Sequence, residues 1–218
     1  MTKDHNPADA ELNQYIKFLK ERLFFEPFSA PFHYNLALAY TKKGLLDEAV
    51  SEFKQAVQFD PDLAQAYVNL GMIHFRQGDL DRCIEANRQA LAIDPDLAMA
   101  HSNLGFAHLQ NGSHSEAVRA CKRAAELMPE LLQAHNNLAV AYLQAEEPDE
   151  SIEASLRVLA LDEEFPPAHY NLALAYRMKN DLPKALEHYE KAKALGYPLD
   201  PEAEEDWRDL VNAPGATH

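Results

Sequence analysis

Apolar and small side chains recur along the chain at helical spacing, in pairs of runs that are separated by turn residues. In residues 64–97 the two runs lie on either side of Gly78, and the block ends at Asp94-Pro95. Spacings of three and four are typical of a helix with one buried face. Glycine after the first run and proline after the second are ordinary helix-termination signals. The pattern therefore predicts two helices joined by a tight turn. The positions that carry it are Leu70, Gly71, His74 and Phe75, then Cys83, Ile84, Asn87, Ala90 and Leu91.

This two-helix block repeats every 34 residues. Pro27, Pro61, Pro95 and Pro129 are each 34 residues apart, and the octapeptide HYNLALAY occupies both 33–40 and 169–176. A fixed period of this length is the signature of a repeat architecture. Five units follow: 30–63, 64–97, 98–131, 132–165 and 166–199.

The turn between the two helices of a unit also repeats. Gly44, Gly78 and Gly112 occupy the same phase, where a left-handed residue ends the first helix. Asn180 can substitute for glycine in the fifth unit, whereas Glu146 in the fourth departs from the pattern.

The residues at four fixed phases resemble the tetratricopeptide repeat (TPR) family. The resemblance implies an all-α protein, a right-handed α-solenoid of five helix pairs with flanking helices, in which the first helix of each pair lines a concave groove. It covers 30–199. The seventh position holds Leu36, Leu70, Leu104, Leu138 and Leu172, and the eighth holds Ala37, Gly71, Gly105, Ala139 and Ala173. The twentieth holds Ala49, Cys83, Ala117, Ser151 and Ala185, and the twenty-seventh Ala56, Ala90, Ala124, Val158 and Ala192.

The flanking segments fit the same scheme. Residues 1–29 predict a leading or capping helix that starts at Asn6-Pro7 and precedes Pro27 in the phase of a second helix. Residues 200–218 predict a C-terminal capping helix and tail, with Asp200-Pro201 at its start and with Trp207 and Leu210 able to cover the last unit.

Composition narrows the class of partner. The formal net charge is −15 and the sequence pI is near 5.0, so a phosphate-binding basic face is not expected and neither is nucleic-acid binding. Residues 1–14 lack the apolar stretch of a secretory signal, and no segment predicts membrane insertion. With two cysteines, a cytoplasmic, reducing location is expected.

Motifs for chemistry are missing from the sequence, which predicts a protein that is not an enzyme and needs no cofactor. Ser51 and Lys54 form an isolated Ser-x-x-Lys that chance explains. Cys83 and Cys121 fall at helix-packing positions, as expected of buried, inert thiols. Four histidines share the fourth position of their units, and packing is favoured there over metal ligation. They are His33, His101, His135 and His169.

The groove implied by the resemblance has a distinctive lining. An asparagine occupies the sixth position of every unit and offers donors and an acceptor to the main chain of an extended peptide, as in the superhelical repeats of O-GlcNAc transferase, which this ladder resembles. The alternative is that some of these asparagines form hydrogen bonds only with a neighbouring helix or with water. The expected peptide-binding residues are Asn35, Asn69, Asn103, Asn137, Asn171, Tyr34, Met72, Phe75, Arg76, Phe106, Tyr170 and Arg177.

Charge separates the groove layer from the rest of the chain. The first fourteen residues of the five units contain no Asp or Glu, and their charges are Lys42, Lys43, Arg76, Arg177 and Lys179. This layer is +5 and everything else is −20. At physiological salt the screening length is about 8 Å, so a ligand in the groove feels the near basic residues most. An extended, apolar-containing protein segment, neutral or modestly acidic, is the predicted partner.

Two alternatives concern the kind of interaction. The clamp for chaperone C-terminal tails, a subtype of the family, needs basic residues where Tyr34, Met99 and Asn103 stand, so such a tail is not expected.

The leading hypothesis is a non-enzymatic adaptor or scaffold that binds a partner segment in its groove. The alternative is a self-associating structural scaffold, a homo-oligomer assembled through its terminal helices.

Overall fold

The computed structural model describes residues 7–199 and 204–207. Within these residues the structure is all-α, with no strand. The helices follow the sequence blocks closely, and the all-α prediction is confirmed. In chain order they are α1 (Pro7–Phe25), α2 (Ala30–Lys43), α3 (Leu46–Phe59), α4 (Ala64–Arg76), α5 (Leu80–Ile93), α6 (Ala98–Gln110), α7 (His114–Leu127), α8 (Leu132–Gln144), α9 (Pro148–Leu161), α10 (Pro166–Met178) and α11 (Leu182–Ala194).

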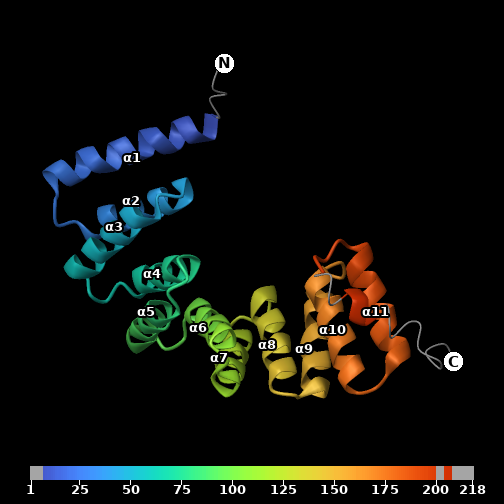
Figure 1. Cartoon of the computed structure of the whole chain (residues 1–218). Helices are drawn as coiled ribbons and strands as arrows, with labels where there is room; N and C mark the ends of the chain where they lie inside the picture. Colours follow the sequence, from blue (N-terminus) through green and yellow to red (C-terminus); the bar gives the residue numbers. More distant parts are fainter. Residues whose placement is uncertain (1–6, 200–203, 208–218) are drawn as a thin grey trace. The chain divides into compact units, whose positions relative to one another are not determined.

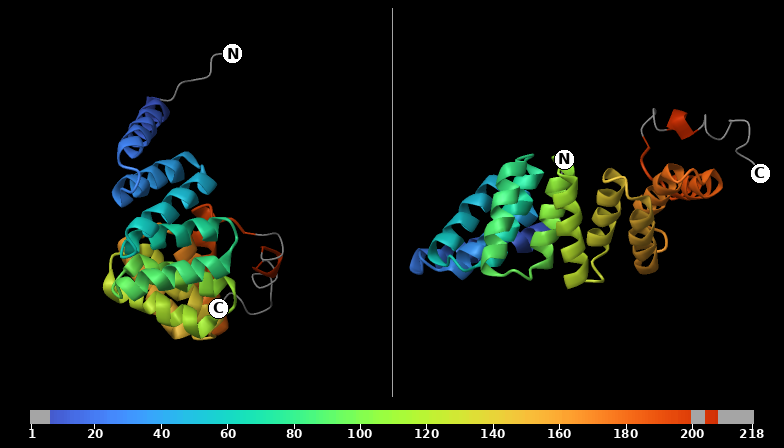
Figure 2. Two further views of the ribbon diagram at one scale, coloured as in Figure 1. Left: turned by 90° about the vertical axis from the view of Figure 1, so that its left-hand side faces the viewer. Right: turned by 90° about the horizontal axis from the view of Figure 1, so that it is seen from below.

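Consecutive helices pack as pairs, as a helix-pair repeat requires. α2 packs on α3, α4 on α5, α8 on α9 and α10 on α11. Contacts between successive pairs join α3 to α4, α7 to α8 and α9 to α10. Figure 1 shows α8, α9, α10 and α11 side by side, and Figure 2 shows the chain from two further directions. A helix pair of this size buries only part of its apolar surface, so stacking of neighbours supplies the core.

The chain divides into two compact units, residues 1–103 and 104–218, and the boundary falls inside α6. In the first unit, Leu36, Phe53 and Ile73 lie in one apolar cluster that also includes Leu19 of α1. In the second unit, Ala173, Tyr189 and Trp207 belong to a cluster at α10 and α11. Each unit therefore has apolar cores of its own.

The turns inside the helix pairs are left-handed at the predicted phase. Gly44 and Gly78 have φ of 78°, and Gly112 has 75°. Glu146 and Asn180 adopt φ of 60° at the same place, so Glu146 departs in residue type but not in conformation. In each turn the next amide donates to a carbonyl of the ended helix, as from Glu147 to Tyr142 at 2.8 Å. This bond closes the last helical turn.

Glycine at the eighth position makes room for side chains of the second helix. A Cβ atom on Gly71 would lie 2.2 Å from Nδ2 of Asn87, and one on Gly105 would lie 2.2 Å from Sγ of Cys121. Asn87 and Cys121 are both fully buried. The helices of these pairs are thus close because one of them lacks a side chain at the contact.

The flanking segments are described in part. α1 packs on α2 and buries its own Leu19 in the apolar cluster of the first unit. A helical turn at 204–207, here called the C-terminal turn, buries Trp207 in the apolar cluster of α10 and α11. Asn6, Asp200, Pro201 and Leu210 lie outside the described residues. None of the described helices combines the length and apolar character that crossing a membrane requires.

Candidate functional site

In the compact unit of residues 1–103, the asparagines at the sixth position of the repeats donate hydrogen bonds to groups of the protein itself. Nδ2 of Asn69 donates to Oη of Tyr34 at 3.3 Å and to the carbonyl of Gln65 at 2.8 Å. Nδ2 of Asn103 donates to Oδ1 of Asn87 at 3.2 Å. Since Nδ2 of Asn87 donates to the carbonyl of Cys83, its oxygen is held toward Asn103. These bonds hold the amide nitrogens of Asn69 and Asn103 on acceptors of the protein. Asn35 lies half-buried on α2.

In the compact unit of residues 104–218, the asparagines at the sixth position are more buried. Oδ1 of Asn137 accepts from Nε2 of Gln133 at 2.7 Å, and Nδ2 of Asn171 donates to Oδ1 of Asn136 at 3.1 Å. Asn137 is 3% exposed and Asn171 6%. The bonds that Asn69 donates to Tyr34 and that Asn171 donates to Asn136 each join neighbouring repeats. The ladder thus serves repeat packing in this structure, and its contact with a peptide stays a prediction.

The remaining candidates in the first unit and α6 are partly accessible. Met72 and Phe75 are half-buried on α4, and Arg76 is exposed at its end. Tyr34 lies edge-on to Phe53 at 5.6 Å between ring centroids, and burial raises the pKa of its hydroxyl. Phe106 is half-buried against the apolar cluster of Leu109, Ala117 and Ala141 in the second unit.

Two of the basic residues counted in the groove layer bind the preceding repeat instead. Nζ of Lys43 donates to Oδ1 of Asn13 at 2.6 Å, and Nζ of Lys179 pairs with Oδ1 of Asp149. Gln77, at the same phase as both lysines, donates to Asp47 at 3.1 Å. These side chains connect neighbouring helix pairs, so less of the +5 charge is available to a ligand than the sequence suggests.

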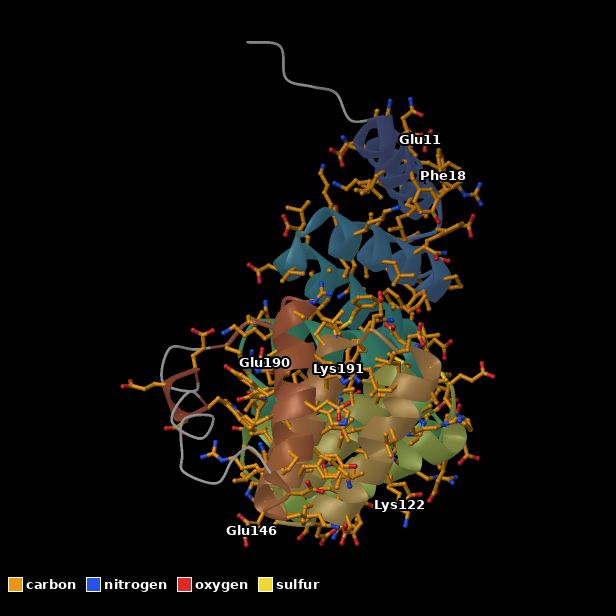
Figure 3. The ribbon with its side chains drawn as sticks, turned by 90° about the vertical axis from the view of Figure 1, so that its right-hand side faces the viewer. Glu11, Phe18, Lys122, Glu146, Glu190 and Lys191 are labelled. Carbon is orange, nitrogen blue, oxygen red and sulfur yellow. The ribbon has the colours of Figure 1, made fainter. Side chains whose placement is uncertain are left out.

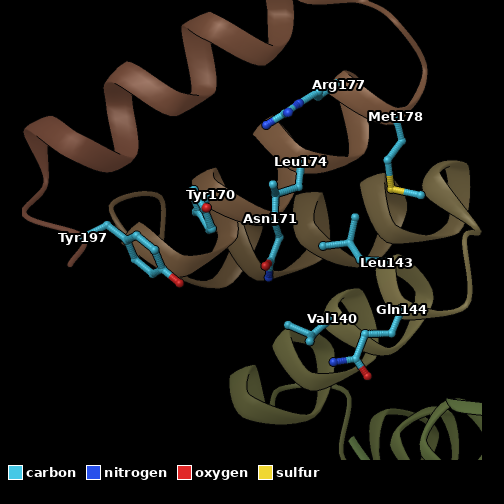
Figure 4. Close-up of a pocket in the computed structure, with 9 residues that line it drawn as sticks. All are labelled: Val140, Leu143, Gln144, Tyr170, Asn171, Leu174, Arg177, Met178 and Tyr197. Atoms are coloured by element: carbon cyan, nitrogen blue, oxygen red, sulfur yellow. The ribbon is translucent and has the colours of Figure 1, made fainter. Parts of the chain in front are cut away.

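Three predicted site residues line one pocket of the second unit. Tyr170, Asn171 and Arg177 of α10 line a hollow of about 650 Å³, here called the terminal pocket, whose lining Figure 4 shows. Its other walls come from α8, the end of α10 and Tyr197. The lining combines apolar and polar side chains. The remaining lining residues are Val140, Leu143, Gln144, Leu174, Met178 and Tyr197.

The segment after α11 contacts the terminal pocket directly. The ring of Tyr197 stacks on Tyr170 with centroids 4.6 Å apart. In the C-terminal turn, Oδ2 of Asp206 lies 3.8 Å from Nη2 of Arg177, and the guanidinium carbon lies 5.3 Å from the centre of the Trp207 ring. Tyr170 and Arg177, both predicted groove residues, therefore contact the segment after α11. No sequence motif indicated these contacts.

The four histidines at the fourth position have a shared structural role. In each, Nε2 donates to the main-chain carbonyl six residues earlier, at 2.9 Å for His101 to Pro95 and for His135 to Pro129. His33 and His169 do the same at 3.0 and 3.2 Å. Because a carbonyl only accepts, the Nε2 proton is assigned. These bonds tie the first helix to the turn before it, as expected of packing residues.

The sequence did not indicate that His169 and His188 form a pair. Their Nδ1 atoms are 3.1 Å apart, and burial lowers the pKa of both rings. Alignment of the repeats could have found this pair, because His33 and Glu52 occupy the same two phases and lie 2.6 Å apart. Among the described residues, no group of three or more His, Cys, Asp or Glu side chains is placed to hold a metal ion.

Both cysteines are free and buried. Burial raises the pKa of Cys83 to about 11 and that of Cys121 to about 12. A thiol with such a pKa is almost entirely protonated at neutral pH and is a poor nucleophile.

Comparison with known proteins identifies the class. Stacked helix-turn-helix pairs define an α-solenoid, and three repeat models match the chain. The models, described as TPR repeat or tetratricopeptide repeat, match residues 37–78, 62–130 with 96–164, and 166–195. The chain therefore belongs to the tetratricopeptide repeat family. No curated protein sequence matches it significantly.

Solved structures of other TPR proteins share the fold. YrrB, described as a TPR protein with an unusual peptide-binding site, superposes with a TM-score of 0.75 at 20% identity, covering 88% of this chain and 98% of its own. MamA gives 0.69 at 23% identity, over 85% and 98%. PilF of Pseudomonas aeruginosa gives 0.69 at 21%, over 84% and 86%. At these identities the likeness shows the fold alone.

Proposed function

We propose that this chain is a non-enzymatic adaptor that binds an extended segment of a partner protein along the faces of its first helices. The TPR fold is that of a protein-interaction scaffold. The terminal pocket is the observation that carries the finer proposal, because it gathers Tyr170, Asn171 and Arg177 beside apolar side chains of α8 and α10. A concave, mostly apolar surface with a few convergent polar groups is the usual form of a binding site.

The site offers both kinds of contact that a peptide needs. Val140, Leu143 and Leu174 accept an apolar side chain, while Gln144 and Arg177 present donors. The description of YrrB as peptide-binding is consistent with this use of the fold. A bound segment that covers the pocket gains from burial of apolar area at about 25 cal/mol per Å².

The test uses a matched pair of charge insertions in the full chain. Met178 lines the terminal pocket and is 44% exposed, and Met128 lies beyond α7, outside the pocket, at 43%. Met178→Glu is expected to lose partners that wild type retains in affinity enrichment from the native extract, while Met128→Glu keeps them. Circular dichroism checks that both remain folded. Identical partner sets for wild type and Met178→Glu would reject binding at this pocket.

Self-association is a second candidate, and α1 is the feature that favours it. Phe24, Phe25 and Phe28 are 74% to 81% exposed around the end of α1. Phe18, labelled in Figure 3, lies half-exposed on the same helix near Tyr15. Contiguous exposed apolar side chains mark interaction surfaces.

A tyrosine in α1 restricts how a second copy of the chain would bind to this helix. Tyr15 stands at the phase where Ala49 and Ala185 are fully buried against the first helix of their own pair. A tyrosine there prevents a similar close approach, so a contact through Phe24 and Phe25 is favoured over addition of another repeat. Light scattering should then show a dimer that Phe24→Ser with Phe25→Ser abolishes, while Met128→Ser, at an exposed residue away from α1, keeps it. A constant monomer mass across concentrations would exclude this candidate.

A further inference from the structure

The charge of Arg177 distinguishes the terminal pocket from an ordinary apolar hollow. Among the nine lining residues, all of which the structure describes, Arg177 alone is charged. The first helices contribute no carboxylate, because their first fourteen residues contain no Asp or Glu. The carboxylate that meets Arg177 comes from the C-terminal turn, where Asp206 lies 3.8 Å away.

This ion pair is weak and open to exchange. The side chains of Arg177 and Asp206 are 38% and 68% exposed, and their distance is at the long end for an ion pair. Exposed pairs of this kind contribute little because water screens them. A second carboxylate with better geometry can replace Asp206, since a guanidinium binds carboxylates through two parallel hydrogen bonds.

The turn that carries Asp206 is anchored by other contacts. Trp207 is 1% exposed and stacks on Tyr189 with ring centroids 4.7 Å apart. Burial of this ring is the anchor, since the ion pair between Nζ of Lys193 and Oε1 of Glu204, at 3.3 Å, is exposed as well. The turn can therefore stay in place while the Asp206 side chain leaves Arg177.

We propose that the terminal pocket selects a partner segment with an apolar side chain next to an acidic residue, and that Asp206 is an internal competitor for Arg177. The apolar side chain lies against Val140, Leu143 and Leu174, and the neighbouring carboxylate takes the place of Asp206. This specificity rests on the proposed function, since it names the segment bound by the same site. It also explains why one acidic residue of the C-terminal turn faces an otherwise acid-free surface.

Selection from a random peptide library displayed on phage tests the proposal on the full chain. Four baits are compared: wild type, Asp206→Asn, Arg177→Gln and Lys179→Gln. The last is the matched control, because Lys179 is two residues from Arg177, carries the same charge and pairs with Asp149 outside the pocket.

Wild type and Lys179→Gln should enrich peptides with Asp or Glu beside an apolar residue. Loss of the competing carboxylate in Asp206→Asn should strengthen binding of a selected acidic peptide by about 1.5-fold to 5-fold, the range expected for an exposed ion pair. Arg177→Gln should remove the preference for acid. A purely structural role of Arg177 would leave that preference unchanged.

The outcomes separate this inference from the broader function. Enriched peptides that show no acidic preference, or the same preference with Arg177→Gln, would overturn the inference and leave groove binding intact. Failure of every bait to enrich any sequence would contradict both proposals. Trp207, the single tryptophan of the chain, supplies a direct readout, because displacement of Asp206 changes the charges around Arg177 above its ring. Its emission should change on titration with a selected peptide, and should not with Arg177→Gln.

Discussion

At the residue scale, the closest helix contacts depend on a glycine facing a buried polar side chain. Gly71→Ala is expected to destabilise the first unit by about 1 to 3 kcal/mol, as overpacking of a core does. The new Cβ would meet Nδ2 and Cγ of Asn87 at 2.2 and 2.9 Å, and Asn87 is held by its bond to Cys83. Urea unfolding measures the change. Asn87→Ala in the same chain removes the clash, so the double variant should be more stable than the sum of the two single effects predicts. Strict additivity would show that the contact relaxes without cost.

The pair of His169 and His188 predicts a loss of stability in acid. Nε2 of His169 donates to Glu163, so its Nδ1 accepts the proton that His188 shares across 3.1 Å. Burial is the largest cause and lowers the pKa of both rings below the ordinary 6.5. Lys191 lowers both values further and His169 lowers that of His188, whereas Glu187 raises both and the bond to Glu163 raises that of His169. Tyr176 stacks on His188. The unfolded chain then binds protons more readily than the folded one. Stability from this pair is therefore complete above pH 6.5 and decreases below it.

His188→Glu reverses that sign and serves as the control. The variant places a carboxylate where Glu52 meets His33, so His169 has an acceptor at each ring nitrogen and its protonated form is favoured. Urea unfolding followed by Trp207 emission reports on the second unit. Its midpoint should fall from pH 7.5 to pH 5.5 in wild type and fall less in His188→Glu. Equal shifts in both proteins would show that other groups cause the acid sensitivity.

The sequence predicted which residues pack between helices, but it did not predict which side chains form hydrogen bonds or ion pairs. Small residues at the eighth position indicated close helices, because periodicity and size alone report on packing. The bonds of Asn69 and Asn103, and the contact of Asp206 with Arg177, depend on side-chain rotamers and on a segment outside the repeat. A repeat pattern contains no information on either. The ladder was thus visible in the sequence while its internal partners were not.

At the scale of elements, each first helix must end in a left-handed residue before the second begins. Glu146 has φ of 60° at the turn after α8, where three other turns have glycine (Figure 3). A side chain in this region costs about 1 to 2 kcal/mol. Glu146→Gly is therefore expected to stabilise the second unit by about 1 kcal/mol, measured by urea unfolding. Asn180→Gly should gain less, because asparagine tolerates φ of 60° better. A stability loss in Glu146→Gly would mean that the glutamate side chain contributes more than the backbone strain costs.

Element boundaries were largely predictable, because the turn signals recur every 34 residues. Asp60-Pro61 and Asp94-Pro95 follow the last residues of α3 and α5, as expected. The proline constraint acts locally, but α9 ends at the same phase with Glu163 in place of proline, so the repeated pattern predicts the boundary better than proline alone. The edge contacts of Lys43 and Lys179 were not predictable in this way, since they join helices of different repeats.

At the scale of the whole molecule, stability is distributed over local cores. Leu36 lies in the apolar cluster of α1 to α5, whereas Leu172 of α10 lies in the second unit, and both are nearly or fully buried. They occupy the same place in the repeated octapeptide HYNLALAY, so the two sites have matched chemistry in different surroundings. In a repeat protein each unit is stabilised mainly by its nearest neighbours.

Leu172→Ala should therefore affect one end of the chain far more than the other. The truncation is expected to cost about 2 to 5 kcal/mol through lost burial and the cavity left behind. Hydrogen exchange followed by mass spectrometry should show faster exchange of the α10 and α11 amides, with those of α2 and α3 unchanged. Leu36→Ala should give the opposite map, with faster exchange in α2 and α3. If either variant accelerates exchange equally in all helices, the chain unfolds as a single cooperative body, and neighbour-limited stability is excluded.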